Sequence, residues 1–255
     1  MRRFWIGALV GGSITLGAVG APAVAQSEWQ FEVTPYAWLS GVDGDIGSLP
    51  ISGISPQHVS LSFGDIWDDL DFAGMLFASA RRDPWVVYVD ATYVKTTSKE
   101  SLPPVVDTLE VTSKTTTFAL AVGRSVSRDD RHNVDAYVGA RAWWLENEFN
   151  ATIAAGFGGG QRSAGTDANW VDPLIGVAGS YVASDRWTLF GNAEVGGFGV
   201  GADNEWSVMA GATYNFNERF GVSMAYRVLA VDYSDDDIVY DVTQSGPVLG
   251  ATFKF

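Results

Sequence analysis

The sequence predicts an all-β protein, an up-and-down antiparallel transmembrane β-barrel of about ten strands. Three observations support this prediction: a hydrophobic period of two that recurs along the chain, a high strand content, and short turns that alternate with longer loops. All three are typical of barrels that cross a membrane with strands. The 29 glycines and 10 tryptophans agree, because glycine weakens helices and tryptophan suits pleated surfaces.

The alternation of side chains is clearest over 206–216, where WSVMAGATYNF places its aromatic, valine and alanine residues on one face. A helix would scatter these residues, whereas a strand sorts them. Ten strands are predicted in this way: 29–42, 70–81, 85–96, 108–124, 134–147, 170–183, 187–199, 206–216, 220–233 and 239–255. Eight strands follow if a weak pair such as 70–81 with 85–96 lies outside the wall, and twelve if the 43–69 loop supplies a hairpin.

The connections between these strands differ in length. Four are short or charged, at 82–84, 125–133, 184–186 and 217–219, whereas three are long, at 43–69, 97–107 and 148–169. Strict alternation places the short ones at one end, which is the arrangement of periplasmic turns and extracellular loops. Because the chain enters from the periplasm and Phe255 finishes there, the strand number must be even.

The first 25 residues read as a signal peptide. Met1-Arg2-Arg3 is cationic, 4–20 is apolar and uncharged, and Ala23-Val24-Ala25 is a small-residue cleavage site. The alternative is an uncleaved transmembrane helix. We expect an exported mature chain, 26–255, that forms one barrel domain.

Charge and composition exclude several classes of function. The formal net charge of -14 argues against nucleic-acid binding, and the absence of cysteine excludes disulfides, thiol nucleophiles and zinc-thiolate sites.

The last strand, SGPVLGATFKF (245–255), ends on an aromatic residue. It resembles the closing strand of Gram-negative outer-membrane barrels, where a terminal Phe is read by the assembly machinery. VTPYAWLSGVDGDIG (33–47), SFGDIWDDLDFAG (62–74) and YRVLAVDYSDDD (226–237) are similar to a family of small, uncharacterised, porin-like outer-membrane barrels. The resemblance implies an outer-membrane location, contact with outer-membrane lipid, lipopolysaccharide and the assembly machinery, and no particular activity. We expect a monomer without a cofactor.

Aromatic residues stand at the ends of the predicted strands. In a membrane barrel such residues form girdles at the two interfaces. The predicted girdle comprises Trp85, Trp187, Trp206, Phe216, Phe220 and Phe255.

Charged residues in mid-strand are expected to face the lumen, because an Arg or Lys that faces lipid at the midplane costs about 2–4 kcal/mol. The predicted lumen network comprises Asp90, Lys114, Arg141, Asp172, Glu194 and Arg227. Equal offsets from the turns place Arg141, Glu194 and Arg227 in one layer. We expect Glu194 to bridge the two arginines, with Asp90 or Asp172 assisting. The alternative is a set of separate, hydrated charges.

Candidate catalytic chemistry is sparse. His58 lies near Ser60 and Asp65 in the first long loop, where a rim enzyme would place a histidine, whereas His132 lies in a turn. Acidic runs at 43–45 and 235–237 lack a calcium-loop spacing, so no metal site is predicted. The acidic cluster at 65–71 around Trp67 is expected to cap the rim; the alternative is a short helix that folds into the barrel mouth.

The sequence therefore favours a structural or narrow porin-like barrel without catalysis. Two alternatives stay open. One is a surface interaction protein, or adhesin, that acts through its long loops. The other is an enzyme that modifies lipid A at the rim through His58.

Overall fold

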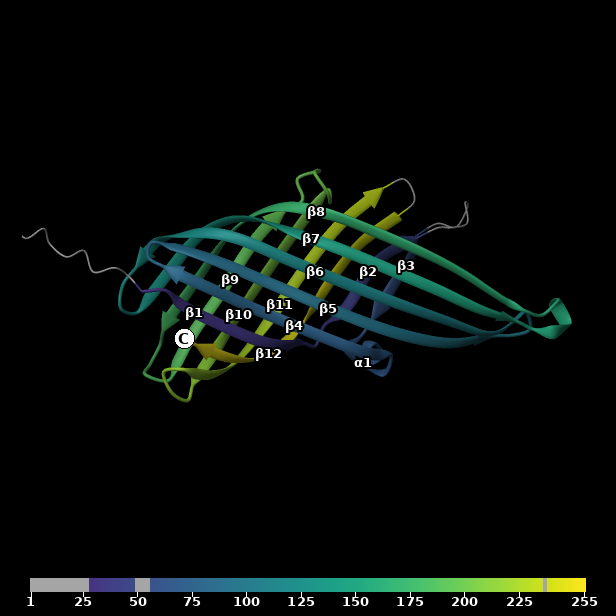
Figure 1. The fold of residues 1–255 in the computed structure, drawn as a ribbon, viewed down its shortest axis with the longest axis horizontal. Coiled ribbons are helices and arrows are strands. Elements are labelled where there is room, and N and C mark those ends of the chain that lie inside the picture. The colour runs from purple at the N-terminus through teal and green to yellow at the C-terminus, as the bar shows by residue number, and fades with distance from the viewer. Residues whose placement is uncertain (1–27, 49–55, 236–237) are drawn as a thin grey trace, which may run out of the picture.

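The computed structural model describes residues 28–48, 56–235 and 238–255, so the expected signal peptide lies outside the described residues. The described chain forms a closed antiparallel barrel (Figure 1). The wall strands are β1 (Gln30–Trp38), β4 (Leu70–Arg82), β5 (Trp85–Leu102), β6 (Val106–Arg128), β7 (His132–Ile153), β8 (Gln161–Val182), β9 (Trp187–Gly196), β10 (Asn204–Asn215), β11 (Phe220–Asp235) and β12 (Ile238–Lys254).

Each wall strand pairs with the next in an up-and-down order, and β1 closes the ring on β12. At the seam Val33 pairs with Phe253, and Trp38 pairs with Val248. The short turns and the C-terminus lie at one end, here called the turn end, on the left of Figure 1. The predicted turns 184–186 and 217–219 share this end, since the Asn215 N–H donates to the Arg186 carbonyl at 2.8 Å. The predicted fold class and the ten predicted wall strands are confirmed.

The 43–69 segment contains a hairpin outside the closed ring. Strand β1 ends at Trp38, and after residues 39–40 the chain continues as β2 (Gly41–Ser48). Strand β2 pairs with 238–245, the half of β12 that lies away from the turn end. Strand β3 (Gln57–Leu61) pairs only with β2, and helix α1 (Phe63–Asp68) leads on to β4. The twelve-strand alternative is therefore correct about the hairpin but wrong about its place in the wall.

The predicted loops 97–107 and 148–169 are wrong, because both are mostly strand. Only 103–105 and 154–160 separate the paired strands, and 155–157 is a single turn of 3-10 helix, η1 (Ala155–Phe157). Strands β5 to β8 therefore project past the rest of the barrel, on the right of Figure 1. We call the part of β5–β8 beyond the row Thr96, Ser113, Asn147 and Thr166 the β-arm.

Most of the β-arm escaped prediction, and only 108–112 lay within a predicted strand. Its side chains are mostly exposed or half-buried, so the hydrophobic alternation is weaker there than in the wall. Cross-strand pairs stabilise it instead. Lys99 Nζ lies 2.8 Å from Glu110 Oε2, and the hydroxyls of Thr97 and Thr112 lie 3.2 Å apart.

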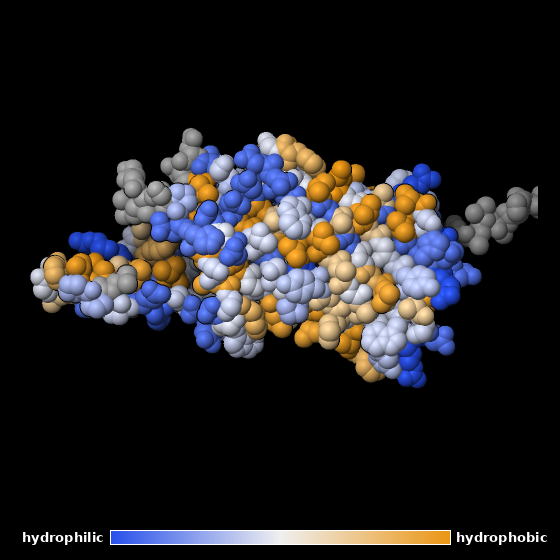
Figure 2. Space-filling view, turned by 180° about the vertical axis from the view of Figure 1, so that it is seen from behind, coloured by the Kyte–Doolittle hydropathy of each residue, from blue (hydrophilic) through white to orange (hydrophobic). Residues whose placement is uncertain are grey.

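Side chains alternate between the lumen and the outer surface along every wall strand. In β10, for example, Glu205 and Ser207 are buried whereas Trp206 and Val208 are exposed. The predicted girdle residues point outward, and Phe220 stacks between Phe216 and Phe253. Figure 2 shows apolar side chains over the middle of the barrel and hydrophilic ones at the turn end. Among the described residues, no helix is long and apolar enough to span a bilayer.

The closure of the ring can be tested by cross-linking, since the chain has no native cysteine. Ala37 and Leu249 are direct partners across the β1–β12 seam and both face outward. We expect Ala37→Cys with Leu249→Cys to form a disulfide, because direct cross-strand partners lie within disulfide reach. Mass spectrometry of the oxidised protein measures the bond.

The matched control is Ala37→Cys with Met224→Cys. Met224 pairs with the other side of Leu249, one strand spacing of about 4.8 Å further away. A disulfide in the control but not in the seam pair would contradict the closure.

Candidate functional site

The middle of the lumen is filled by an ionic layer around Arg141 on β7, which is 2% exposed. Its guanidinium contacts Glu194 on β9 at 2.5 Å and pairs with Glu205 on β10. The indole of Trp143 donates to Glu205 at 2.9 Å, and the Tyr137 hydroxyl donates to Glu194 at 3.2 Å. Both carboxylates are thus bound by a cation and a neutral donor, as buried charges require.

Arg227 on β11 makes the second ionic contact, which crosses the lumen. Its guanidinium lies 2.8 Å from Asp90 on β5, near the opposite side of the ring. Tyr36 links the pair, since its hydroxyl donates to Asp90 at 2.7 Å and accepts from Arg227 at 3.2 Å. The guanidinium also lies 4.9 Å from the ring centre of Trp38, a cation–π contact.

The structure corrects the predicted bridge. Glu194 binds Arg141 but does not pair with Arg227, whose carboxylate partner is Asp90. The second carboxylate on Arg141 is Glu205, which the prediction missed because its strand began one residue too late, at Trp206. The alternation of side chains could have identified it, since Glu205 is two residues from the inward-facing Ser207 and so lies on the same face of the strand.

Asp172 faces the lumen but pairs with no arginine. It accepts hydrogen bonds from the Trp170 indole at 2.8 Å and from the Ala202 backbone N–H at 2.6 Å. The carboxylate therefore fixes the β9–β10 connection against β8.

The lumen placement predicted for Lys114 is wrong. Its side chain points outward on β6 and binds Glu146 at 2.9 Å, with Glu148 at 3.8 Å. Strand β6 extends 23 residues, so Lys114 lies near the β-arm, where an outward charge meets water and not lipid.

A third polar cluster lies in the lumen near the turn end. Asp135 on β7 has no exposed surface and binds the Arg81 guanidinium. It also accepts hydrogen bonds from Tyr88 at 2.5 Å, Ser125 at 2.8 Å and Asn133 at 2.7 Å. The prediction missed this cluster, although Asp135 shares the parity of Arg141 on the same strand.

An aromatic layer closes the lumen on the β-arm side of Arg141. Trp170 on β8 stacks on Tyr233 of β11, with ring centres 3.9 Å apart and planes at 7°. Trp143 stacks on Trp170 at 5.4 Å and contacts Tyr240 of β12 edge-on at 6.2 Å. Since β7 and β12 lie on opposite sides of the ten-strand ring, these four rings span the lumen.

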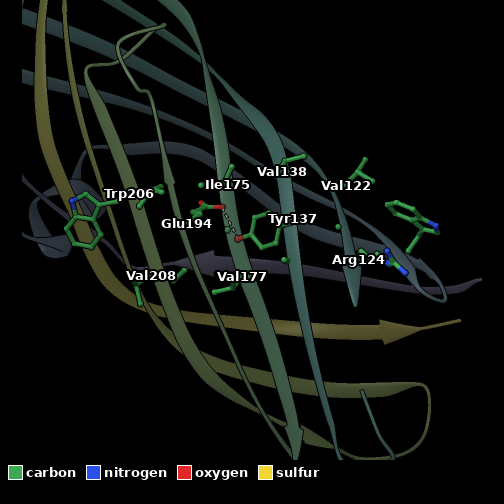
Figure 3. A pocket seen from close by; sticks show the side chains of 15 residues that line it. Val122, Arg124, Tyr137, Val138, Ile175, Val177, Glu194, Trp206 and Val208 are labelled. Atoms are coloured by element: carbon green, nitrogen blue, oxygen red, sulfur yellow. Dashed lines mark hydrogen bonds between the residues drawn. The ribbon is translucent and has the colours of Figure 1, made fainter. Parts of the chain in front are cut away.

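Small residues make room for the ionic layer. Tyr137 lies between Gly123 on β6 and Gly176 on β8 in one cross-strand row, which continues to Glu194. A Cβ atom at Gly176 would lie 2.4 Å from the Tyr137 ring. The ring therefore crosses β8 and reaches Glu194 on β9, as the dashed line in Figure 3 shows.

The rim residues are exposed and form local contacts. His58 faces two carboxylates, with Nδ1 3.1 Å from Asp45 and Nε2 3.7 Å from Asp43. Ser62 caps α1, and hydrogen bonds from the Ser62 hydroxyl and backbone N–H lower the pKa of Asp65. The acidic segment forms a short helix, but none of its side chains is buried, so it lies at the rim and not in the mouth.

His132 is the first residue of β7, next to the turn, and Asp129 and Ser127 contact its ring nitrogens. In the described part of the chain, no group of three or more His, Asp or Glu side chains is arranged to hold a metal ion.

Comparison with known proteins supports the fold and identifies no family. No family model and no curated protein matches the chain. Among solved structures, the chain is similar to the outer membrane protease OmpT from Escherichia coli, with a TM-score of 0.55 and 12% identity over 90% of this chain and 97% of that one. The fold is therefore that of outer-membrane β-barrels.

Two further solved structures have lower TM-scores of 0.40. A major outer membrane protein from Thermus thermophilus is 12% identical over 89% of this chain and 100% of that one. The toluene transporter TbuX of Ralstonia pickettii is 11% identical over 89% of this chain and 88% of that one.

The ionic layer gives a stability prediction. Arg141→Met leaves Glu194 and Glu205 buried without their cation, so we expect the free energy of unfolding to fall by about 3–5 kcal/mol. Urea-dependent tryptophan fluorescence in lipid vesicles measures it. The control is Lys99→Met in the β-arm, whose exposed pair with Glu110 contributes less than about 1 kcal/mol. Equal losses in the two variants would contradict the central role of Arg141.

Proposed function

We propose that the protein is an outer-membrane barrel with a structural, non-conducting role, exported as a mature chain. The observation that carries the proposal is that two layers of side chains cross the lumen. The ionic layer crosses it through the Arg227–Asp90 contact, and the aromatic layer through the Trp143–Tyr240 contact. Side chains that join opposite walls leave no continuous water column of porin width. The closed lumen favours the structural role over the narrow porin-like role.

The outer-membrane location rests on three features. The barrel presents an outward apolar surface with aromatic residues near both ends. Its fold is that of barrels such as OmpT, which is itself an outer membrane protein. Strand β12 carries the segment 245–255, which resembles the closing strand of Gram-negative outer-membrane barrels, and its aromatic residues lie at the turn end. We propose a monomer in contact with outer-membrane lipid and lipopolysaccharide, with the turn end in the periplasm.

We propose that the barrel has no catalytic activity. His58 was the one rim residue suited to a lipid A enzyme. Both of its ring nitrogens face carboxylates, Asp45 and Asp43, and its hydrogen-bond partner is neither Ser60 nor Asp65. A histidine held in this way has no nitrogen directed at a nucleophile.

Conductance in planar bilayers tests the closed lumen. We expect the wild-type protein to give no stepwise current. Arg227→Ala, Trp143→Ala and Tyr240→Ala together remove side chains that cross the lumen, so this variant is expected to conduct. The control shortens outward side chains on the same three strands, β7, β11 and β12, with Trp144→Ala, Met224→Ala and Leu249→Ala.

Gel mobility before and after boiling checks that each variant is folded. Wild-type conductance steps, or equal currents in the two triple variants, would overturn the closed lumen.

A second candidate function is recognition of a partner by the β-arm. The specific observation is its projection beyond the barrel, with Val105 and Phe157 exposed at its tip (Figure 1). We expect that removing 98–111 and 148–165, which are paired ends of two hairpins, leaves a folded barrel but lowers cell adhesion. Adhesion assays with cells that display either form measure this. Unchanged adhesion would remove the second candidate.

A further inference from the structure

The outer face of the barrel carries an apolar hollow of about 840 Å³ that no role above uses (Figure 3). It extends across six neighbouring strands, β5 to β10, or about 24 Å at the usual strand spacing. Two outward rows border it. The row nearer the β-arm is Val122, Val138, Ile175, Val195 and Trp206, and the row nearer the turn end is Trp85, Arg124, Ala136, Val177, Ala193 and Val208.

The hollow exists because of residue size. Ala136 and Ala193 are small members of the row nearer the turn end, so that row leaves space between its larger side chains. The floor is the row between, where the hollow is lined by Gly123, which is buried, and by Gly176, which is half-buried; neither has a side chain to fill it. Behind this floor Tyr137 is fixed in the lumen by its hydrogen bond to Glu194. The ionic layer therefore supports the floor of the hollow from the lumen side.

One cation stands at the end of this hollow. Arg124 is exposed, points outward and lies over the Trp85 ring at 6.0 Å. Strand β6 ends four residues later at Arg128, so Arg124 lies near the turn end. Within the described residues Arg124 forms no ion pair, although a cation at a membrane interface favours an anionic partner.

We propose that the hollow binds one phospholipid of the periplasmic leaflet, with its phosphate on Arg124 and an acyl chain along the two apolar rows. The proposal rests on the outer-membrane location proposed above. An arginine recognises phosphate by paired, charge-assisted hydrogen bonds, and the adjacent Trp85 is a residue type that prefers the headgroup level.

The charge distribution selects this leaflet. At the other end of the hollow Trp206 is preceded by 187–205, WTLFGNAEVGGFGVGADNE, which contains no Lys or Arg. Lys95 and Lys114, the outward cations on β5 and β6 at this level, are already paired with Asp71 and Glu146. The phosphates of lipopolysaccharide in the outer leaflet would therefore find no unpaired cation on β5, β6, β9 or β10 at this end of the hollow, among the described residues. The occupant is therefore a glycerophospholipid and not lipid A.

Native mass spectrometry tests the proposal. Delipidated protein is incubated with equal amounts of phosphatidylethanolamine and lipid A, then released from detergent. We expect a single phosphatidylethanolamine adduct on the wild type. Arg124→Gln is expected to lower the bound fraction about tenfold by loss of a charged hydrogen bond. Ala193→Phe fills the hollow and is expected to lower it to a similar extent.

Two matched controls separate a site from general lipid contact. Ala251→Phe adds the same ring to a lipid-facing position on β12, and Arg219→Gln removes a cation from another turn at the same end. Both are expected to retain the adduct within twofold of the wild type. Boiling-dependent gel mobility shows that all four variants are folded.

Equal retention in all five proteins would overturn the site, and a preference for lipid A would overturn the assigned ligand. These outcomes are independent of the bilayer recordings. A silent barrel without a selective adduct removes this proposal alone, whereas a conducting barrel that retains the phospholipid removes the closed-lumen function alone.

Discussion

The lumen depends on the pairing of buried guanidinium groups with carboxylates. Arg141 and Arg227 are both almost entirely out of water, and an unpaired charge there would cost several kcal/mol. Arg141 therefore holds β7 to β9 and β10, and Arg227 holds β11 to β5 and β1. These contacts join strands that share no backbone hydrogen bonds. They fix the cross-section of the barrel as well as its charge balance.

The aromatic residues around this layer have positions that follow from it. Trp143 donates to Glu205 and also stacks on Trp170, so one side chain belongs to both layers. Tyr137 reaches Glu194 only because Gly176 leaves the space its ring occupies. The same glycine exposes backbone on the outer face, where the apolar hollow lies. The missing side chain at Gly176 thus affects both the filling of the lumen and the shape of the lipid-facing surface.

The β-arm shows what happens where the strands leave the lipid band. Outward charges begin there, with Lys95 paired to Asp71 and Lys114 paired to Glu146. Such pairs are favourable only where water reaches them, so they mark the upper limit of the lipid-facing surface. Beyond this level β5 to β8 continue without β4 or β9 beside them. The barrel thereby becomes a support for an exposed sheet, which is why recognition by the β-arm is the second candidate function.

Residue parity in the sequence was enough to determine the ten wall strands, the outward girdle and the inward direction of Asp90, Arg141, Glu194 and Arg227, because a strand alternates locally. It did not determine which charges meet. That Arg227 pairs with Asp90 and not with Glu194 depends on the closure and stagger of the whole ring, which no local pattern encodes. Most of the β-arm, all but 108–112, was missed for a related reason. Its strands are stabilised by cross-strand pairing in water, so only the tertiary structure shows that they are strands.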